Sequence, residues 1–300
     1  MSAFTDLIEN EEMNKIMGGT LYLVATPIGN LADFSARAIK VLKGVDFIAA
    51  EDTRNAQKLL SCFEIPFKEC ISYFEHNKKE RGSYIVNRLI NGESCALVTD
   101  AGTPAVSDPG EDIVRLCAES GVAVTAVPGC CAAVNALSLS ALCTRRFVFE
   151  GFLPASAGDR RRHLDTLRLE ERTLIFYEAP HKLRATLADL FSAFGNRHLA
   201  LCREMTKLNE EIMRTTLENA IRYYEENAPR GEYVLVVEGV DPSAQPCKEG
   251  NDFFASLSHQ EHVAHYEGEG LTRMDAIKAA ARDLGISKSE LYRRLHQENN

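Results

Sequence analysis

Short apolar runs alternate with amphipathic helical patterns through most of the chain, and this alternation constrains the fold more than any other feature. In the first half the runs are TLYLVAT, VDFIAA, ECISYF, SCALVT and VAVTAV. Helices are predicted between them over 78–91, 111–120 and 131–139, and over DFSARAIKVLKG, with Asp33 as its N-cap and Gly44 just past its end. Strands that alternate with helices in this way predict a parallel α/β sheet.

A second series of strands begins near Phe147, with FVFEGF, TLIFYE, HLALCRE, EIMRTTL and EYVLVVEG. Helices are predicted at 160–169, 182–194 and 217–227, but only a short polar gap separates HLALCRE from EIMRTTL. That gap predicts a hairpin and hence a mixed sheet. The fold class is therefore two α/β domains followed by a small helical extension. We expect a tail at 1–18, the first domain at 19–128, the second at 129–240, and at 241–300 a Pro- and Gly-rich linker with two helices around Gly285.

Composition restricts the possible functions. The 300 residues carry a net charge of −9, which disfavours a protein that coats nucleic acid without specificity. The nine cysteines form no CxxC pair, and such usage is typical of reduced thiols in a cytoplasmic protein. No leader pattern begins the chain, and no apolar run approaches the roughly 20 residues of a membrane span. We expect a cytoplasmic protein that makes no membrane contact.

Unusual loops follow the predicted strands: TPIGN (26–30), AEDTR (50–54), FEHNK (74–78), DAGTP (100–104) and PGCCAA (128–133). Ligands of open α/β sheets bind beyond the carboxyl ends of the strands. Glycine and proline let a ligand approach the backbone, and Asp100 could accept hydrogen bonds from an ammonium or hydroxyl group. Any one loop could be an ordinary turn with a capping aspartate, but five at one sheet edge favour a binding site.

The chain lacks the common phosphate and metal motifs. Neither GxGxxG nor GxxxxGK[ST] occurs, which disfavours dinucleotide and P-loop sites. His259, His262 and His265 are spaced by three residues in HQEHVAH, but no carboxylate stands at ligand spacing, so we expect no metal site there.

Several longer motifs occur in a characteristic order: GTLYLVATPIGNLAD, DFIAAEDTRNAQKLL, LVTDAGTPAVSDPG, FVFEGFLP, TLIFYEAPHKL, CREMTKLNEE and RGEYVLVVEG. Over about residues 19–240 the chain thereby resembles the bacterial small-subunit ribosomal RNA 2′-O-ribose cytidine methyltransferases, a branch of the tetrapyrrole-methylase superfamily. The resemblance implies S-adenosylmethionine (SAM) in a cleft between two α/β domains, and a homodimer. It implies as substrate a decoding-centre cytidine of 16S RNA. The acidic overall charge favours RNA within the small ribosomal subunit over free RNA, but the sequence does not decide between them.

The resemblance also implies which residues bind the cofactor. DAGTP would lie against the methionine and ribose of SAM, and the IFYE segment would approach the adenine from the second domain. The expected cofactor-binding residues are Pro27, Gly29, Asp100, Ala101, Gly102, Thr103, Cys131, Ala132, Phe176 and Tyr177.

Ribose methylation is an in-line displacement in which a hydroxyl oxygen attacks the methyl group and a thioether leaves. A positioned base would accelerate it by roughly 10²–10⁴-fold. Each candidate has a structural alternative: a helix cap for Glu51–Arg54, an ion pair for Glu204 and Lys207, and a structural hydrogen bond for His76. The sequence does not select a base among Glu51, Asp52, Arg54, His76, Glu204 and Lys207, with Glu178 and Arg203 as further polar groups.

Basic residues in two places are candidate RNA contacts. Residues 272–297 carry six basic and three acidic side chains in an otherwise acidic chain, and a basic run stands at 160–162. Both could equally be solvated faces or packing surfaces. The candidate RNA-binding residues are Arg160, Arg161, Arg273, Lys278, Lys288 and Arg293. Alternative functions are a small-molecule methylase of the same fold, a non-catalytic SAM- or ribosome-binding protein, and a nucleotide hydrolase.

Overall fold

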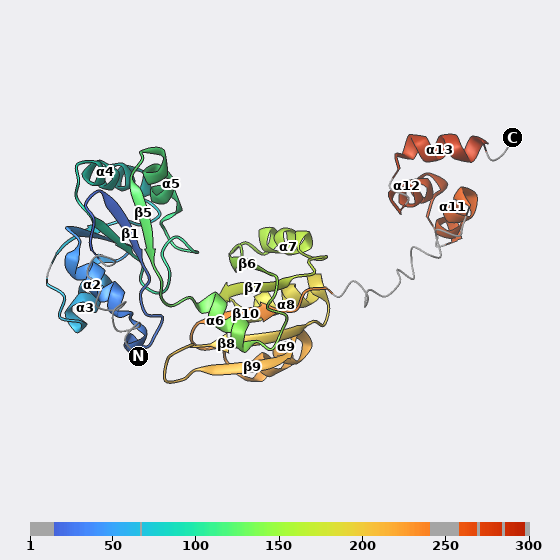
Figure 1. Cartoon of the computed structure of the whole chain (residues 1–300). Coiled ribbons are helices and arrows are strands. Elements are labelled where there is room, and N and C mark those ends of the chain that lie inside the picture. Colours follow the sequence, from blue (N-terminus) through green and yellow to red (C-terminus); the bar gives the residue numbers. More distant parts are fainter. Residues whose placement is uncertain (1–14, 67, 241–257, 269–270, 284–285, 298–300) are drawn as a thin grey trace. The chain divides into compact units, whose positions relative to one another are not determined.

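The computed structural model describes residues 15–66, 68–240, 258–268, 271–283 and 286–297 (Figure 1). It divides into two compact units, residues 1–240 and residues 241–300, which we describe separately. Most of the expected tail, and the expected linker segment 241–252, lie outside the described residues.

The first sheet is parallel throughout and has the strand order β3-β2-β4-β1-β5. Its central strands β2 and β4 are buried on both faces. Successive residues of a strand face opposite sides, and accordingly two hydrophobic clusters form, one under α2 and α3 and the other under α4 and α5. The strands are β1 (Thr20–Val24), β2 (Phe47–Ala50), β3 (Glu69–Ser72), β4 (Cys95–Val98) and β5 (Ala123–Val127); the helices are α2 (Ala36–Gly44), α3 (Thr53–Cys62), α4 (Lys78–Ile90) and α5 (Glu111–Glu119).

The predicted ends of α2 are both wrong: Gly44, expected just past the helix, is its last residue. Asp33 is not an N-cap but ends a short 3-10 helix, η2 (Leu31–Asp33), whose first turn is held by the Asn30 side chain. The cap of α2 is Ser35, whose hydroxyl accepts the backbone N–H of Ala38. Helix α3 was not predicted, because its first residues are polar and only Ala56 and Leu60 of the helix are buried.

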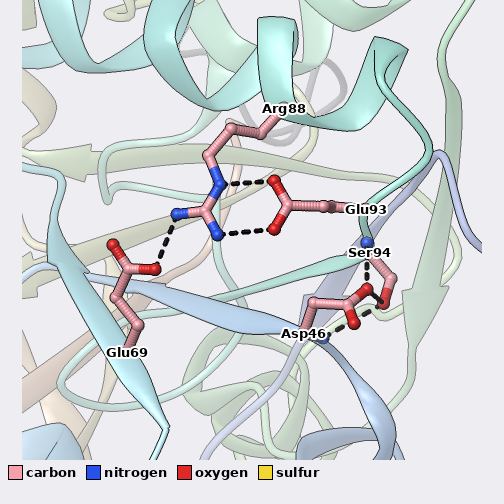
Figure 2. A network of polar contacts seen from close by, with 5 residues as sticks. All are labelled: Asp46, Glu69, Arg88, Glu93 and Ser94. Atoms are coloured by element: carbon pink, nitrogen blue, oxygen red, sulfur yellow. Dashed lines mark hydrogen bonds and ion pairs between the residues drawn. The ribbon is translucent and has the colours of Figure 1, made fainter.

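A polar network closes the amino ends of the first sheet (Figure 2). Arg88 of α4 donates from Nε and Nη2 to the Glu93 carboxylate, at 2.6 and 2.7 Å, and from Nη1 to Glu69 of β3 at 2.8 Å. Beside it, the Asp46 carboxylate accepts both the backbone N–H and the hydroxyl of Ser94 at 2.7 Å. The starts of β2, β3 and β4 are thereby joined at the edge opposite to the strand-end loops.

The second sheet is mixed, with the order β6-β7-β10-β8-β9. Strand β6 runs parallel to β7, whereas the remaining pairs are antiparallel, and β8 and β9 form the predicted hairpin. Helices α7, α8 and α9 contribute to the core on one face, and α6 packs on the other. The strands are β6 (Phe147–Phe152), β7 (Thr173–Glu178), β8 (His198–Arg203), β9 (Glu211–Thr216) and β10 (Tyr233–Val237); the helices are α6 (Ala132–Leu139), α7 (Ala157–Thr166), α8 (Leu183–Phe194) and α9 (Leu217–Glu226).

The second unit is helical. Its described residues form α11 (His259–Gly268), α12 (Arg273–Asp283) and α13 (Lys288–Gln297) around a core that includes Val263, Ile277 and Leu291. The two predicted helices are thus confirmed. The HQEHVAH segment, however, begins α11 and is not part of a linker. No helix among the described residues is long and apolar enough to cross a membrane.

Candidate active site

A cavity of about 360 Å³ lies in the first unit and is walled by both sheets. The first sheet contributes the residues that follow β2 and β4, and the second contributes β7, β8, β10 and the loop after β8. The lining includes the predicted residues Glu51, Asp100, Ala101, Gly102, Thr103, Cys131, Ala132, Tyr177, Glu178, Glu204 and Lys207. Four of the five predicted strand-end loops therefore meet at this cavity, as expected for parallel strands, whereas no residue of the loop 74–78 lines it.

Backbone contacts fix the loop at Asp100–Thr103. The N–H groups of Thr26 and Gly102 donate to each other's carbonyl oxygen, at 2.9 and 3.1 Å. Gly102 has a φ of +86°, a conformation that glycine adopts at little cost. The Thr103 hydroxyl donates to the Cys130 carbonyl at 3.0 Å. Three of the strand-end loops thus form one rigid edge.

Two loops at the cavity hold residues in left-handed conformations. Ala105 and Ser107 have φ values of +66° and +63°, and Glu204 and Thr206 have +50° and +65°. Such backbone costs of order 1–3 kcal/mol per residue and is concentrated at functional sites. Close packing holds the first loop, since a Cβ on Gly151 would lie 2.7 Å from the Ser107 hydroxyl oxygen. Both loops therefore carry backbone strain beside the cavity, which lowers the stability of the fold.

Three carboxylates make one end of the cavity electronegative. Burial, together with the nearby Asp100 carboxylate, raises the pKa of Glu51. Burial and the charges of Glu51 and Asp100 raise the pKa of Asp108 to about 7. Asp100 itself accepts a hydrogen bond from the Asn55 amide at 3.0 Å. Because like charges held together favour a cation, this end of the cavity suits a positively charged ligand group.

The opposite wall carries an ion-paired lysine. Lys207 Nζ lies 2.9 Å from Glu204 Oε1 and 2.8 Å from Glu232 Oε2. The backbone N–H of Glu232 and then Lys207 lower the pKa of Glu204. The expected ion pair is therefore present, and it forms part of the cavity wall.

A second cavity, of about 370 Å³, adjoins the first. The two share Ile28, Asp100, Ala101, Lys207 and Glu232 in their linings. Pro27 and Gly29, which were predicted to bind the cofactor, line only this second cavity, together with Asp52 and Asn55 among others.

Other base candidates lie outside the first cavity. Asp52 caps α3 by accepting the Arg54 backbone N–H at 2.8 Å and pairs with the Arg54 guanidinium at 2.7 Å. Asp52 and Arg54 thus form the helix cap that the sequence allowed as the alternative to a catalytic role. His76 is exposed, lines neither cavity, and contacts the Phe74 ring edge to face. Arg203 pairs with Glu211 across the β8–β9 hairpin at 2.8 Å.

Two predicted contacts need correction. Phe176 is fully buried in the cluster under α8 and α9, because alternation along β7 turns its side chain away from the cavity and presents Tyr177 instead. The Tyr177 hydroxyl accepts the backbone N–H of Ala133 at 3.1 Å. Arg160 is not a surface residue for RNA: its side chain is 8% exposed and is paired with Asp189 at 2.6 Å.

The sequence analysis missed several residues of the cavity. Asp108 stands in the quoted stretch LVTDAGTPAVSDPG, and the pattern Asp-Pro-Gly after a binding loop was a usable signal. Ile28 likewise stands in the predicted loop TPIGN, and Val106 and Ser107 stand in the same stretch as Asp108. No local signal marks the remaining residues, which the second sheet and its loops bring to the cavity: they are Phe152, Ala179, Cys202, Met205, Glu232, Tyr233 and Val234. Within the described residues, no group of three or more His, Cys, Asp or Glu is arranged to hold a metal ion.

The sequence model of the tetrapyrrole (corrin/porphyrin) methylases matches residues 20–221. The chain belongs to this family. Within it, the chain is 48% identical to the ribosomal RNA small subunit methyltransferase I of Halalkalibacterium halodurans, over 93% of this chain and 96% of that protein. It is 43% identical to the protein of the same name from Bacillus subtilis, over 93% and 94%.

Solved structures share the fold at low sequence identity. The uroporphyrin-III-C-methyltransferase of Thermus thermophilus superposes with a TM-score of 0.53 at 20% identity, and covers 73% of this chain and 94% of its own. Diphthine synthase superposes with a TM-score of 0.56 at 13% identity, and covers 73% and 90%. About a quarter of this chain thus has no counterpart in either structure.

Proposed function

We propose that this protein transfers a methyl group from SAM to the ribose 2′-oxygen of a cytidine in the decoding centre of 16S ribosomal RNA, cytidine 1402. It would act in the cytoplasm, on RNA within the small ribosomal subunit, as a homodimer and without a metal. The observation that carries the proposal is the cavity between the two sheets, in a chain whose 48%-identical relative is named a ribosomal RNA small subunit methyltransferase.

The lining of the first cavity fits SAM in size and charge. Small-molecule sites occupy about 300–1,000 Å³ and are mostly apolar with a few placed polar groups. The carboxylates of Glu51 and Asp100 suit the sulfonium and ammonium charges. The amino end of α6, at Cys131 and Ala132, offers backbone N–H groups that suit a carboxylate. When bound, SAM supplies an electrophilic methyl group, and these residues would hold and align it.

The extent of the similarity favours RNA over a tetrapyrrole as the acceptor. The small-molecule methyltransferase from Thermus covers 73% of this chain, whereas the ribosomal RNA methyltransferases cover 93%. The family model ends at residue 221, before the helical unit begins. That unit exposes the basic side chains Arg273, Lys278, Lys288 and Arg293, which could bind phosphates and position the RNA.

Methyl transfer from tritiated SAM tests the reaction. We expect label in 16S RNA offered as free RNA or as assembled small subunits, and none in a tetrapyrrole substrate. Nuclease digestion of the product should place the label on a 2′-O-methylcytidine. Label in the tetrapyrrole, or in neither acceptor, would refute the proposal. Sedimentation at micromolar concentration tests the dimer, which requires twice the chain mass of 33.3 kDa.

Cofactor binding is tested separately by calorimetry. Replacement of Asp100 by alanine removes a charged partner of the ligand, and we expect SAM affinity to fall by about 10- to 100-fold, equivalent to roughly 1.5–3 kcal/mol. The matched control is Glu119→Gln, an exposed carboxylate at the end of α5, which should leave affinity unchanged. Equal affinities in wild type and Asp100→Ala would show that the loop does not hold the cofactor.

A further inference from the structure

We infer that Asp108 is the base that accepts the proton of the attacking ribose hydroxyl. The inference rests on the proposed function and goes beyond it, because neither the resemblance nor the sequence selects a base. It stands on where Asp108 lies, how its loop is held, and what its carboxylate does not bind.

Asp108 lines the cavity that also contains Glu51 and the Asp100–Thr103 loop. Its loop is held rigidly on both sides. Ala105 and Gly110 are so close that a Cβ on Gly110 would lie 2.8 Å from the Ala105 Cβ, and Ser107 packs against Gly151 of β6. A group that must meet a reacting atom gains from being fixed in advance in this way.

Four other carboxylates of the cavity have hydrogen-bond or ion-pair partners. Asp100 is bonded to Asn55, and Glu204 is paired with Lys207. Glu232 is paired with the same lysine, and Glu178 accepts the Thr186 hydroxyl at 2.5 Å. For Glu51, the Asp100 backbone favours the ionised form, but burial and the Asp100 carboxylate outweigh it and raise the pKa. Among the described residues, no hydrogen bond or ion pair engages the Asp108 carboxylate, which leaves its oxygens free to accept a proton.

The charges around Asp108 suit a base at neutral pH. Glu51 and Asp100 face it from the ends of β2 and β4, and Tyr177 faces it from β7. Burial and the two carboxylates raise the pKa of Asp108 to about 7, the value at which a base is both present in ionised form and strong enough to take a proton. The remaining titratable or charged groups of the cavity wall are Cys131, Glu178, Cys202, Glu204, Lys207, Glu232 and Tyr233.

The step balances without any further reactant. The 2′-oxygen forms a bond to the methyl carbon as the carbon–sulfur bond breaks, and the bonding pair stays on sulfur, giving a neutral thioether. The hydroxyl proton passes to an Asp108 carboxylate oxygen. After the product leaves, Asp108 releases this proton to water and is again ionised.

Single-turnover methylation across pH 5.5–9 tests the inference, with free 16S RNA or small subunits as acceptor, whichever the wild type methylates. For the wild type we expect the rate to rise tenfold per pH unit and to level off near pH 7. Asp108→Asn should slow the plateau by about 10²–10⁴-fold and lose the inflection, while its calorimetric SAM affinity stays within threefold. Asp108→Glu, which keeps a carboxylate, should recover part of the rate and keep an inflection. Glu111→Gln, an exposed carboxylate in the first turn of α5, is the control and should match the wild type.

The outcomes separate the two proposals. A wild type that labels neither acceptor would overturn the proposed function and the role of Asp108 with it. An active wild type together with an Asp108→Asn variant of unchanged rate, or of unchanged pH profile, would overturn the role of Asp108 alone. The same holds if Asp108→Asn only weakens SAM binding and leaves the single-turnover rate at saturating SAM intact.

Discussion

Replacing Arg160 with methionine should destabilise the protein without acting on RNA directly. The Arg160 guanidinium donates from Nε to Asp189 Oδ2 at 2.8 Å, and both side chains are 8% exposed. Arg161, the next residue, bonds the other carboxylate oxygen at 2.8 Å, but its side chain is 69% exposed. The two arginines thus share one carboxylate and differ mainly in burial, which makes them a matched pair.

The expected loss in the free energy of unfolding depends on which charges each variant leaves without a partner. Breaking a buried pair typically costs 3–5 kcal/mol, because one charge stays buried without its partner. In Arg160→Met, Asp189 keeps Arg161 as a partner, so we expect a somewhat smaller loss of about 2–4 kcal/mol. Arg161→Met loses one exposed bond, and we expect about 0.5 kcal/mol. At roughly 2–4 °C per kcal/mol, the melting temperature should fall by about 4–16 °C in the first variant and by 2 °C or less in the second.

Thermal unfolding at several pH values is the assay. Burial alone would raise the pKa of Asp189, but Arg161 and Arg160 outweigh it and hold the pKa below 3.8. A carboxylate with a lowered pKa stabilises the fold above its unfolded pKa, and this stability disappears as pH falls through the folded value. The difference between wild type and Arg160→Met should therefore be full at pH 7 and shrink below pH 4. Equal losses in both variants, or a fall in RNA methylation by Arg160→Met at unchanged stability, would refute the reasoning.

Two other changes act at the amino ends of the first sheet and in the helical unit. Arg88→Met removes the guanidinium that bonds Glu93 and Glu69 and lies 3.8 Å from the centre of the Phe47 ring. Because both carboxylates are partly exposed, we expect the free energy of unfolding, measured in denaturant, to fall by only about 1–2 kcal/mol, and by less in 1 M salt, with SAM affinity unchanged. A chain that ends at Asp252 should still fold and bind SAM, since residues 1–240 form their own compact unit. It should methylate RNA poorly, and its methylation rate should depend less steeply on salt concentration. Full activity with an unchanged salt dependence would show that the helical unit does not contact RNA.

The sequence predicted the site best where parallel strands dictated its position. Periodicity gave the strand ends, and parallel strands must bring their carboxyl ends to one edge, so Asp100–Thr103 and Glu51 were found together. The opposite wall comes from an antiparallel part of the second sheet, where neighbours are far apart in sequence. Met205 and Glu232 reach the cavity only through the packing of the two sheets, which no local pattern encodes.

The wrong assignments have a common physical cause. A motif identifies a segment, but the function of a residue depends on which face it occupies. Phe176 and Tyr177 are adjacent, yet strand alternation buries one and exposes the other to the cavity. Arg160 and Arg161 are adjacent in a basic run, yet one is buried and the other exposed. Burial is decided by packing partners elsewhere in the chain, here Asp189, so it could not be predicted from the run itself.

The carboxylates at the cavity should also cost the empty protein stability, and Asp108 provides the test. Its pKa is raised from 3.8 to about 7, so the folded protein holds the protonated form more firmly than the unfolded chain does. Stability linked to this group is therefore complete below about pH 4 and is lost progressively as pH rises toward 7.

Asparagine stays neutral and keeps the shape of the side chain. Asp108→Asn should therefore melt at a higher temperature than the wild type at pH 8 in the absence of SAM, and at nearly the same temperature at pH 4. Active-site residues often lower the stability of the folded protein in this way. If Asp108→Asn instead melts at a lower temperature than the wild type at pH 8, then the ionised Asp108 side chain stabilises the fold, and its pKa is not raised by its surroundings.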